Sequence, residues 1–130
     1  MYKGIKIFSK KRQIGNQAEK LAQKYLTKNG LKFIEANYLT KMGEIDIIML
    51  DKSSKSLVFV EVRYRQNSSF GSAVDTVNSN KQAKIILAAK HFLLEYPKYD
   101  NFICRFDIIG LESDLKCPKI NWIKGAFEAI

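Results

Sequence analysis

The sequence has few of the residues that build the common small metal sites. It contains one histidine, His91, and two cysteines, Cys104 and Cys117, neither of which has a partner at metal-ligand spacing. This composition excludes a zinc site built from cysteine and histidine. We expect Cys104 to be a buried side chain in a strand, Cys117 to lie in a loop, and His91 to lie on the surface of a helix.

Long hydrophobic runs are also lacking. No segment approaches the length that a membrane-spanning helix requires. The first residues, MYKGIKIFSKKRQ, carry basic side chains without the apolar core of a signal peptide. We therefore expect a soluble, cytoplasmic protein that is not bound to a membrane.

Acidic residues are scarce relative to basic ones. The 130 residues include 13 Asp and Glu against 22 Lys and Arg, which gives a net charge of +9 and a pI of about 9.6. Such an excess in a small domain is typical of a protein that binds a polyanion, either nucleic acid or an anionic membrane. Simple solubility is the alternative. We favour nucleic acid, and DNA in particular.

The basic residues are most concentrated at the N-terminus. We interpret residues 1–13 as a basic N-terminal arm and residues 14–130 as a single domain. The arm holds no acidic residue, so it is either a solvated tail or a segment that contacts phosphates. Its basic residues are Lys3, Lys6, Lys10, Lys11 and Arg12.

Hydrophobic periodicity predicts two helices and five strands. Asn16 suits the N-cap of the first helix, Gly30 its end, and Pro97 the end of the second. Glu19 either closes a capping box with Asn16 or reaches a site on the sheet that the helix covers. The order α-β-β-β-α-β-β indicates an α/β (α+β) fold, with a mixed central sheet flanked by helices. The predicted helices are 16–29 and 79–96; the predicted strands are 31–38, two within a hairpin at 43–65, 102–110 and 120–123. The polar segment 66–80 is the best candidate for a mobile loop.

The hairpin brings two carboxylates together. Pairing Leu50 with Leu57 matches the apolar side chains of the two strands and places Asp46 opposite Glu61. Opposed like charges destabilise a sheet unless something compensates them. A divalent cation, Mg²⁺ or Mn²⁺, would compensate because it prefers oxygen ligands. Alternatively, the two acids lie at a solvated edge or pair with basic residues. The other pairs of this register are Ile48 with Phe59 and Glu44 with Arg63, and the basic candidates for pairing are Arg63, Arg65 and Arg105.

The arrangement of the acidic residues resembles the core of the PD-(D/E)XK nucleases. Glu19 lies on the first helix, Asp46 on the second strand, and Glu61-Val62-Arg63 on the third. More closely, the chain resembles the YraN-like family of bacterial proteins, which is related to archaeal Holliday junction resolvases. The residues that carry this resemblance span roughly 15–127: Gly15, Glu19, Leu21-Ala22, Tyr25-Leu26, GEID at 43–46, VFVEV at 58–62, Arg65, Phe70-Gly71, Lys81, RFD at 105–107, Trp122-Ile123 and Ala126-Phe127.

The resemblance implies a restriction-endonuclease-like fold and a metal-dependent endonuclease activity on nucleic acid. Its metal site, holding Mg²⁺ or Mn²⁺, would consist of Asp46, Glu61 and the Val62 carbonyl, with Glu19 as a further ligand or as a group that orients water. Arg63 would contact the scissile phosphate. The related resolvases act as dimers, so a homodimer is expected. The residues that would contact the nucleic-acid backbone are Lys10, Lys11, Arg12, Arg65 and Lys81.

Two positions depart from the pattern. Arg63 stands where these nucleases have lysine, and Ala18 stands where the family usually has glycine. Arginine stays protonated, so it binds phosphate but cannot act as a general base. An inactive nucleic-acid-binding module of the same fold, or a protein-interaction module, is therefore the alternative to an endonuclease.

Overall fold

A five-stranded sheet carries both long helices. The computed structural model describes residues 3–67 and 73–129, with side chains described from Lys11 onward. The Phe70-Gly71 pair and the middle of the segment predicted to be mobile lie outside the described residues. The elements in chain order are α1 (Lys3–Lys28), β1 (Lys32–Leu39), β2 (Glu44–Asp51), β3 (Ser56–Arg65), the 3₁₀ helix η1 (Val74–Thr76), α2 (Ser79–Glu95), the 3₁₀ helix η2 (Pro97–Tyr99), β4 (Ile103–Glu112) and β5 (Lys119–Phe127).

The sheet is mixed, as the sequence predicted. The strands lie in the order β1-β2-β3-β4-β5, with β3 and β4 parallel and every other neighbouring pair antiparallel. The crossover between the parallel strands contains α2, because parallel neighbours need a long connection. This arrangement matches the predicted order and is consistent with a restriction-endonuclease-like fold.

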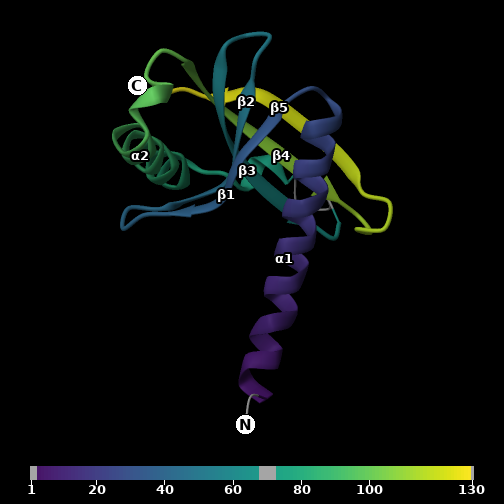
Figure 1. Ribbon diagram of the computed structural model, residues 1–130. Helices are drawn as coiled ribbons and strands as arrows, with labels where there is room; N and C mark the ends of the chain where they lie inside the picture. The colour runs from purple at the N-terminus through teal and green to yellow at the C-terminus, as the bar shows by residue number, and fades with distance from the viewer. Residues whose placement is uncertain (1–2, 68–72, 130) are drawn as a thin grey trace.

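The two helices cover opposite faces of the sheet (Figure 1). On β2 and β3, Ile48 and Phe59 pack with α2, whereas Met49 and Val60 pack with α1. These assignments follow from the period of two along a strand, which sends successive side chains to opposite faces. The hairpin faces deduced from the sequence are therefore confirmed for its apolar part.

Helix α1 is longer than predicted. It begins at Lys3, so Asn16 lies inside the helix, and the predictions of an N-cap at Asn16 and of a capping box with Glu19 are wrong. No proline interrupts residues 3–28, and an interior glycine such as Gly15 costs a helix only about 1 kcal/mol relative to alanine. The predicted end is confirmed, because Gly30 has a φ of +96° and Leu31 N–H donates to the Leu26 carbonyl at 3.1 Å.

The predictions about exposure are confirmed for two residues and wrong for a third. Cys117 and His91 are exposed, as expected. The prediction of a buried Cys104 is wrong: both Ile103 and Cys104 are exposed. Because consecutive strand residues point to opposite faces, neither face of the sheet is covered where β4 begins. In the part of the chain that the structure describes, no helix combines the length and hydropathy needed to cross a membrane.

Candidate metal centre

The strand pairing of the hairpin stops where its acidic residues begin. Ile48 pairs with Phe59 as predicted, and the last ladder pair is Ile47 with Val60. The next position shows no ladder pair; instead the backbone N–H of Val62 donates a hydrogen bond of 2.8 Å to Oδ2 of Asp46. The Asp46 carboxylate therefore lies between the two strands, beside the Glu61 side chain.

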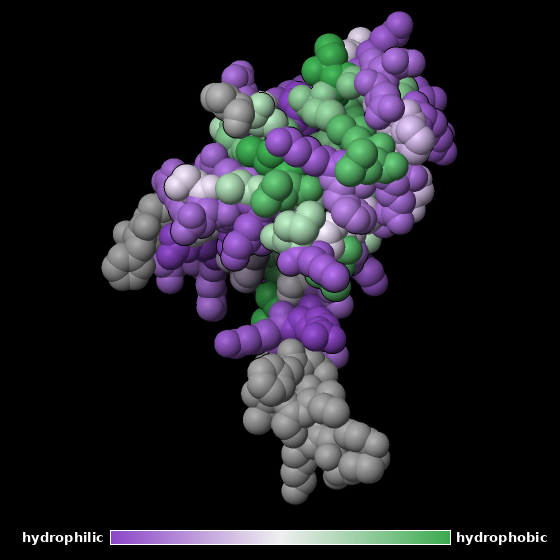
Figure 2. Space-filling model, turned by 90° about the vertical axis from the view of Figure 1, so that its left-hand side faces the viewer, coloured by the Kyte–Doolittle hydropathy of each residue, from purple (hydrophilic) through white to green (hydrophobic). Residues whose placement is uncertain are grey.

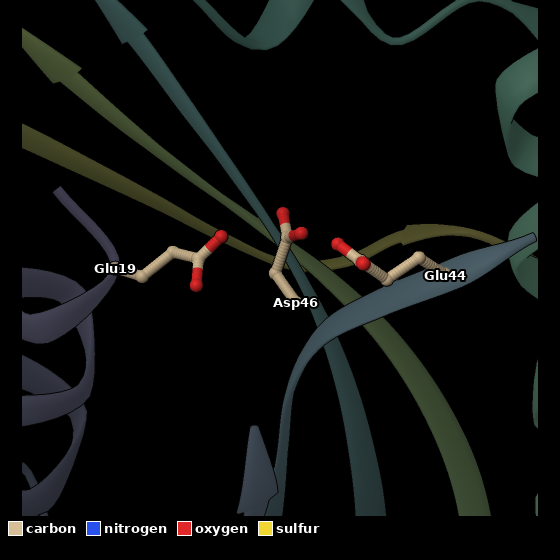
Figure 3. Close-up of side chains that lie close together, drawn as sticks. All are labelled: Glu19, Glu44 and Asp46. Atoms are coloured by element: carbon tan, nitrogen blue, oxygen red, sulfur yellow. The ribbon is translucent and has the colours of Figure 1, made fainter. Parts of the chain in front are cut away.

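Three carboxylates converge at this point. Glu19 from α1 and Glu44 and Asp46 from β2 each place a carboxylate oxygen within 4.8 Å of the others, and all three side chains are half-buried. Figure 3 shows Asp46 between the two glutamates, with the three carboxylates turned toward one another. Glu44 is a site residue that the sequence argument missed, because the strand register placed it opposite Arg63.

Glu61 is a fourth carboxylate, buried next to Asp46. Its side chain is only 4% exposed, and its Oε2 lies 3.0 Å from Arg63 Nη2 and 3.7 Å from Lys81 Nζ. Its Oε1 is buried and has no hydrogen-bond partner among the described residues. Burial, reinforced by the charge of Asp46, raises the pKa of Glu61 to about 8, although Lys81 and Arg63 act in the opposite direction.

The two glutamates on either side of Asp46 also have raised pKa values. Burial, together with the charges of Asp46 and Glu44, raises the pKa of Glu19 to about 7. Burial and the charge of Asp46 likewise raise the pKa of Glu44. Asp46 thus contributes to the raised pKa of three neighbouring carboxyl groups, which is the effect expected of like charges sharing a site.

This donor set fits a divalent cation. All four side chains offer oxygen, the ligand type that Mg²⁺ and Mn²⁺ prefer. The orphaned Oε1 of Glu61 is a buried acceptor without a donor, which normally costs about 1–3 kcal/mol. A cation between Asp46 and Glu61 would give Oε1 of Glu61 a partner, and its positive charge would offset the repulsion among the carboxylates.

Helix α2 supplies a basic residue to the group. The chain packs tightly here, since a Cβ on Gly43 would lie 2.9 Å from the Lys84 carbonyl oxygen. This close approach holds the N-terminal half of α2 beside the start of β2. Lys81, in the first turn of α2, consequently reaches Glu61. The sequence predicted a contact of Lys81 with nucleic acid and did not predict this one.

The other predicted basic residues lie on α1 and at the end of β3. Lys11 and Arg12 are exposed on α1, and Arg65 is half-buried at the end of β3. The side chain of Lys10 lies outside the described part of the chain. Of the alternative partners proposed for the acids, Arg63 does pair with Glu61.

Arg105 takes part in a separate cluster. Its guanidinium contacts Asp51 Oδ2 and Asp107 Oδ1, both at 3.0 Å, so its suggested pairing with Asp46 or Glu61 is wrong. The fully buried Asp107 also accepts hydrogen bonds of 2.9 Å from Trp122 Nε1 and from the Gly125 backbone. The RFD sequence and Trp122 thus join β4 to β5, apart from the carboxylates.

Asn37 completes the rim of the site. It has a φ of +54° inside β1, and the flanking pairs Ala36–Ile47 and Tyr38–Ile45 place it across from Asp46. A hydrogen bond from its side chain acts to lower the pKa of Glu19. Asparagine is depleted in strands, and this was the signal in the sequence that could have identified the position.

A hollow opens over the carboxylates on the α1 side. It has a volume of about 380 Å³, and its polar lining combines acids from two elements with amide and basic side chains. A phosphate group could reach the carboxylates from this side, next to a guanidinium. The lining residues are Arg12, Gly15, Asn16, Glu19, Asn37 and Glu44.

Comparison with known proteins finds similarity along nearly the whole chain. A profile of UPF0102, described as an uncharacterised protein family, matches residues 18–111. A UPF0102 protein of Coxiella burnetii is 48% identical over 122 residues, covering 94% of this chain and 98% of the relative. One from Nitrosococcus oceani is 45% identical over 116 residues, with 89% and 92% coverage, and one from Pseudomonas syringae is 43% identical over 122 residues, with 93% and 98% coverage.

Proposed function

Since the chain belongs to the UPF0102 family, in agreement with its resemblance to the YraN-like proteins, we propose its function from the site: a metal-dependent endonuclease that hydrolyses phosphodiester bonds of nucleic acid. One observation carries this proposal. The buried Oε1 of Glu61 has no partner among the described residues, and Glu61 lies next to Asp46, which belongs to the group of three carboxylates with Glu19 and Glu44. An oxygen in that position is best explained as a ligand of a divalent cation.

Each acidic residue has a distinct part in the proposed site. Asp46 and Glu61 would hold the cation from adjacent strands, with the Val62 carbonyl as the ligand that the family resemblance suggests. Glu44 and Glu19 would complete its surroundings from the open side. The cation, Mg²⁺ or Mn²⁺, would supply an activated water and stabilise charge on the scissile phosphate.

In the proposed mechanism a carboxylate accepts the proton of the attacking water. Arg63 stays protonated and cannot take a proton from water. Glu19 lines the hollow beside Asp46 and Glu44, so its carboxylate is placed to orient the attacking water and accept its proton. Arg63 and Lys81 would hold the Glu61 side chain and neutralise the phosphate as charge develops on it.

The partner that the charge supports is nucleic acid. A net charge of +9 favours binding to a phosphate backbone. We propose DNA as the substrate, with four-way junctions suggested by the resemblance to resolvases. Contacts from Lys11, Arg12 and Arg65 would position the backbone without reading its sequence.

A cleavage assay tests the proposal. Purified protein is incubated with four-way-junction, flap, single-stranded and linear DNA in Mg²⁺ or Mn²⁺, beside the Asp46→Asn variant. We expect the wild type to cut at least one substrate and the variant to cut none. Equal cutting by both proteins would indicate a contaminating nuclease, and absence of cutting on every substrate would contradict the endonuclease.

A second function has one observation in its favour. Arg63 is bound to Glu61 at 3.0 Å, and an arginine at this position suits a protein that binds nucleic acid without cutting it. The Arg63→Lys variant separates the two functions. Activity that appears only in this variant would identify the natural protein as an inactive binding module.

A further inference from the structure

Helix α1 carries a row of basic and amide side chains on its exposed surface. The row consists of Arg12, Asn16, Lys20, Lys24 and Lys28, which follow one another at intervals of four residues. Residues at this interval are neighbours on the helix surface, and each step turns by about 40°, so the row winds obliquely across the exposed surface of α1. All five side chains are exposed. Of these five residues, only Arg12 was predicted from the sequence to contact nucleic acid.

A chain of hollows follows this row away from the carboxylates. The first, of about 380 Å³, contains Arg12 and Asn16 together with Glu19. The second, of about 270 Å³, contains Asn16, Glu19 and Lys20. The next two, of about 410 and 510 Å³, are both lined by Lys20 and Lys24, and the last of them also reaches Lys28. Successive hollows share lining residues, so the four adjoin one another along α1, starting at the candidate metal centre.

Beyond the site, the charged residues that line these hollows are all basic. Glu19 is the only acidic residue in α1, and the two hollows farthest from the site have no acidic lining. The opposite side of the molecule differs: the hollow beside the end of α2 combines Lys90 with Asp100 and with Leu93 and Leu94. Figure 2 shows this side, where apolar and hydrophilic surface alternate. The hollows along α1 and the hollow beside the end of α2 therefore differ in the charge of their lining residues.

The length of the row matches a short stretch of a phosphate backbone. From residue 12 to residue 28 the helix rises about 24 Å at about 1.5 Å per residue. One strand of a B-form duplex advances about 3.4 Å per phosphate along its axis, so this length corresponds to at most roughly seven nucleotides. Lysine side chains along such a path would contact phosphates without reading bases.

We propose that the row from Arg12 to Lys28 is a track for the backbone of one nucleic-acid strand, which it leads to the carboxylates around Asp46. This inference rests on the proposed function for the identity of the partner and adds the path that the strand takes. The strand runs along α1, passes Lys24 and Lys20, and reaches the hollow between Asn16 and Glu19. The surface at the C-terminal end of α2, around Lys90 and Lys98, stays outside the complex.

Matched charge variants test the track. Lys20→Gln with Lys24→Gln removes two charges from the row, and Lys90→Gln with Lys98→Gln removes the same charge from the α2 side. Affinity for a fluorescent 30-nucleotide single-stranded DNA is measured between 50 and 300 mM salt. We expect the slope of log affinity against log salt to become shallower by about 1.4 for the row variant, at about 0.7 per lost phosphate contact, and to stay unchanged for the control.

The outcomes also separate this inference from the proposed function. Equal slopes for the two variants would overturn the track and leave nucleic acid as the proposed partner. Absence of DNA binding in the wild type would overturn the proposed partner as well as the track. If the wild type instead binds vesicles that contain phosphatidylserine, the row is a site for an anionic membrane. Unchanged Mn²⁺ binding by the row variant confirms that its metal centre is intact.

Cross-linking gives an independent reading of the path. A photoreactive group is attached to Lys24→Cys or, as control, to Lys90→Cys, after the exposed Cys104 and Cys117 have been replaced by serine. We expect the DNA to cross-link at position 24 and not at position 90. Cross-linking at position 90 alone would contradict the proposed path.

Discussion

Asp46 accepts a hydrogen bond from the backbone N–H of Val62 at the point where the pairing of β2 and β3 ends. A single side chain therefore replaces the next ladder contact and at the same time carries the charge that raises the pKa of Glu19, Glu44 and Glu61. The two effects can be separated by mutation, because asparagine keeps a hydrogen-bond acceptor and loses the charge.

The Asp46→Asn variant should lose metal binding without losing stability. In metal-free buffer its free energy of unfolding should equal or exceed that of the wild type, since repulsion among the carboxylates is relieved while the Val62 N–H keeps an acceptor. Asp46→Ala should be about 1 kcal/mol less stable than Asp46→Asn because it leaves that N–H without its partner. Urea unfolding in EDTA measures all three proteins; a clear loss of stability in Asp46→Asn would contradict the electrostatic account.

Substitution of Asn37 should change metal affinity without lowering stability. Asn37 and Lys55 both have a positive φ, of 54° and 51°, which glycine adopts without strain. Lys55→Gly, in the turn between β2 and β3, should therefore be about 1 kcal/mol more stable than the wild type and bind Mn²⁺ equally well. Asn37→Gly should be at least as stable as the wild type but bind Mn²⁺ more weakly, because Glu19 loses a partner. Equal metal affinity in both variants would show that Asn37 plays no part in the site.

The packing of the hairpin is tested by truncating Phe59. This ring is fully buried against Phe92 and Phe106. Phe59→Ala should cost about 3–5 kcal/mol of unfolding free energy, whereas Leu94→Ala, at a side chain that is 83% exposed, should change it by less than about 0.5 kcal/mol. A cost below about 1 kcal/mol for Phe59→Ala would mean that the hairpin faces are misassigned.

Asp51 makes the protein sensitive to acid. Hydrogen bonds from Ser53 and Arg105 lower the pKa of Asp51 from 3.8 to about 2. The stability that Asp51 contributes is therefore present above about pH 4 and is lost as the pH falls toward 2. Thermal unfolding between pH 2 and pH 5 should show a smaller loss of stability in Asp51→Asn than in the wild type; parallel curves would exclude Asp51 as a cause.

The sequence predicts the fold well because its signals are local and repeated. Paired Leu50 and Leu57, and Ile48 with Phe59, determine the hairpin register, and Gly30 marks the end of α1. The start of α1 was missed because residues 3–14 have no apolar stripe to reveal a helix and no proline to exclude one. The prediction for Cys104 failed because burial depends on where the helices end above the sheet, which strand periodicity does not contain.

The candidate site was predicted in its acidic residues but not in its geometry. Glu19 and Glu61 each lie close enough to Asp46 for its charge to raise their pKa. The ladder pair of Asp46 with Glu61 that the register predicted is absent, and the carboxylates that converge are those of Glu19, Glu44 and Asp46. Glu44 joins them because Asp46 turns in between the strands, and Lys81 joins them because Gly43 allows α2 to approach. Both contacts depend on tertiary packing between segments distant in the sequence, which no local pattern reveals.

Calorimetric titration with Mn²⁺ tests the central claim most directly. The wild type, Glu61→Gln and the control Glu95→Gln, an exposed residue on α2, are titrated under the same conditions. The account predicts binding by the wild type and by Glu95→Gln, and loss of binding by Glu61→Gln. Binding that survives in Glu61→Gln, or no binding by the wild type, would contradict a cation held between Asp46 and Glu61.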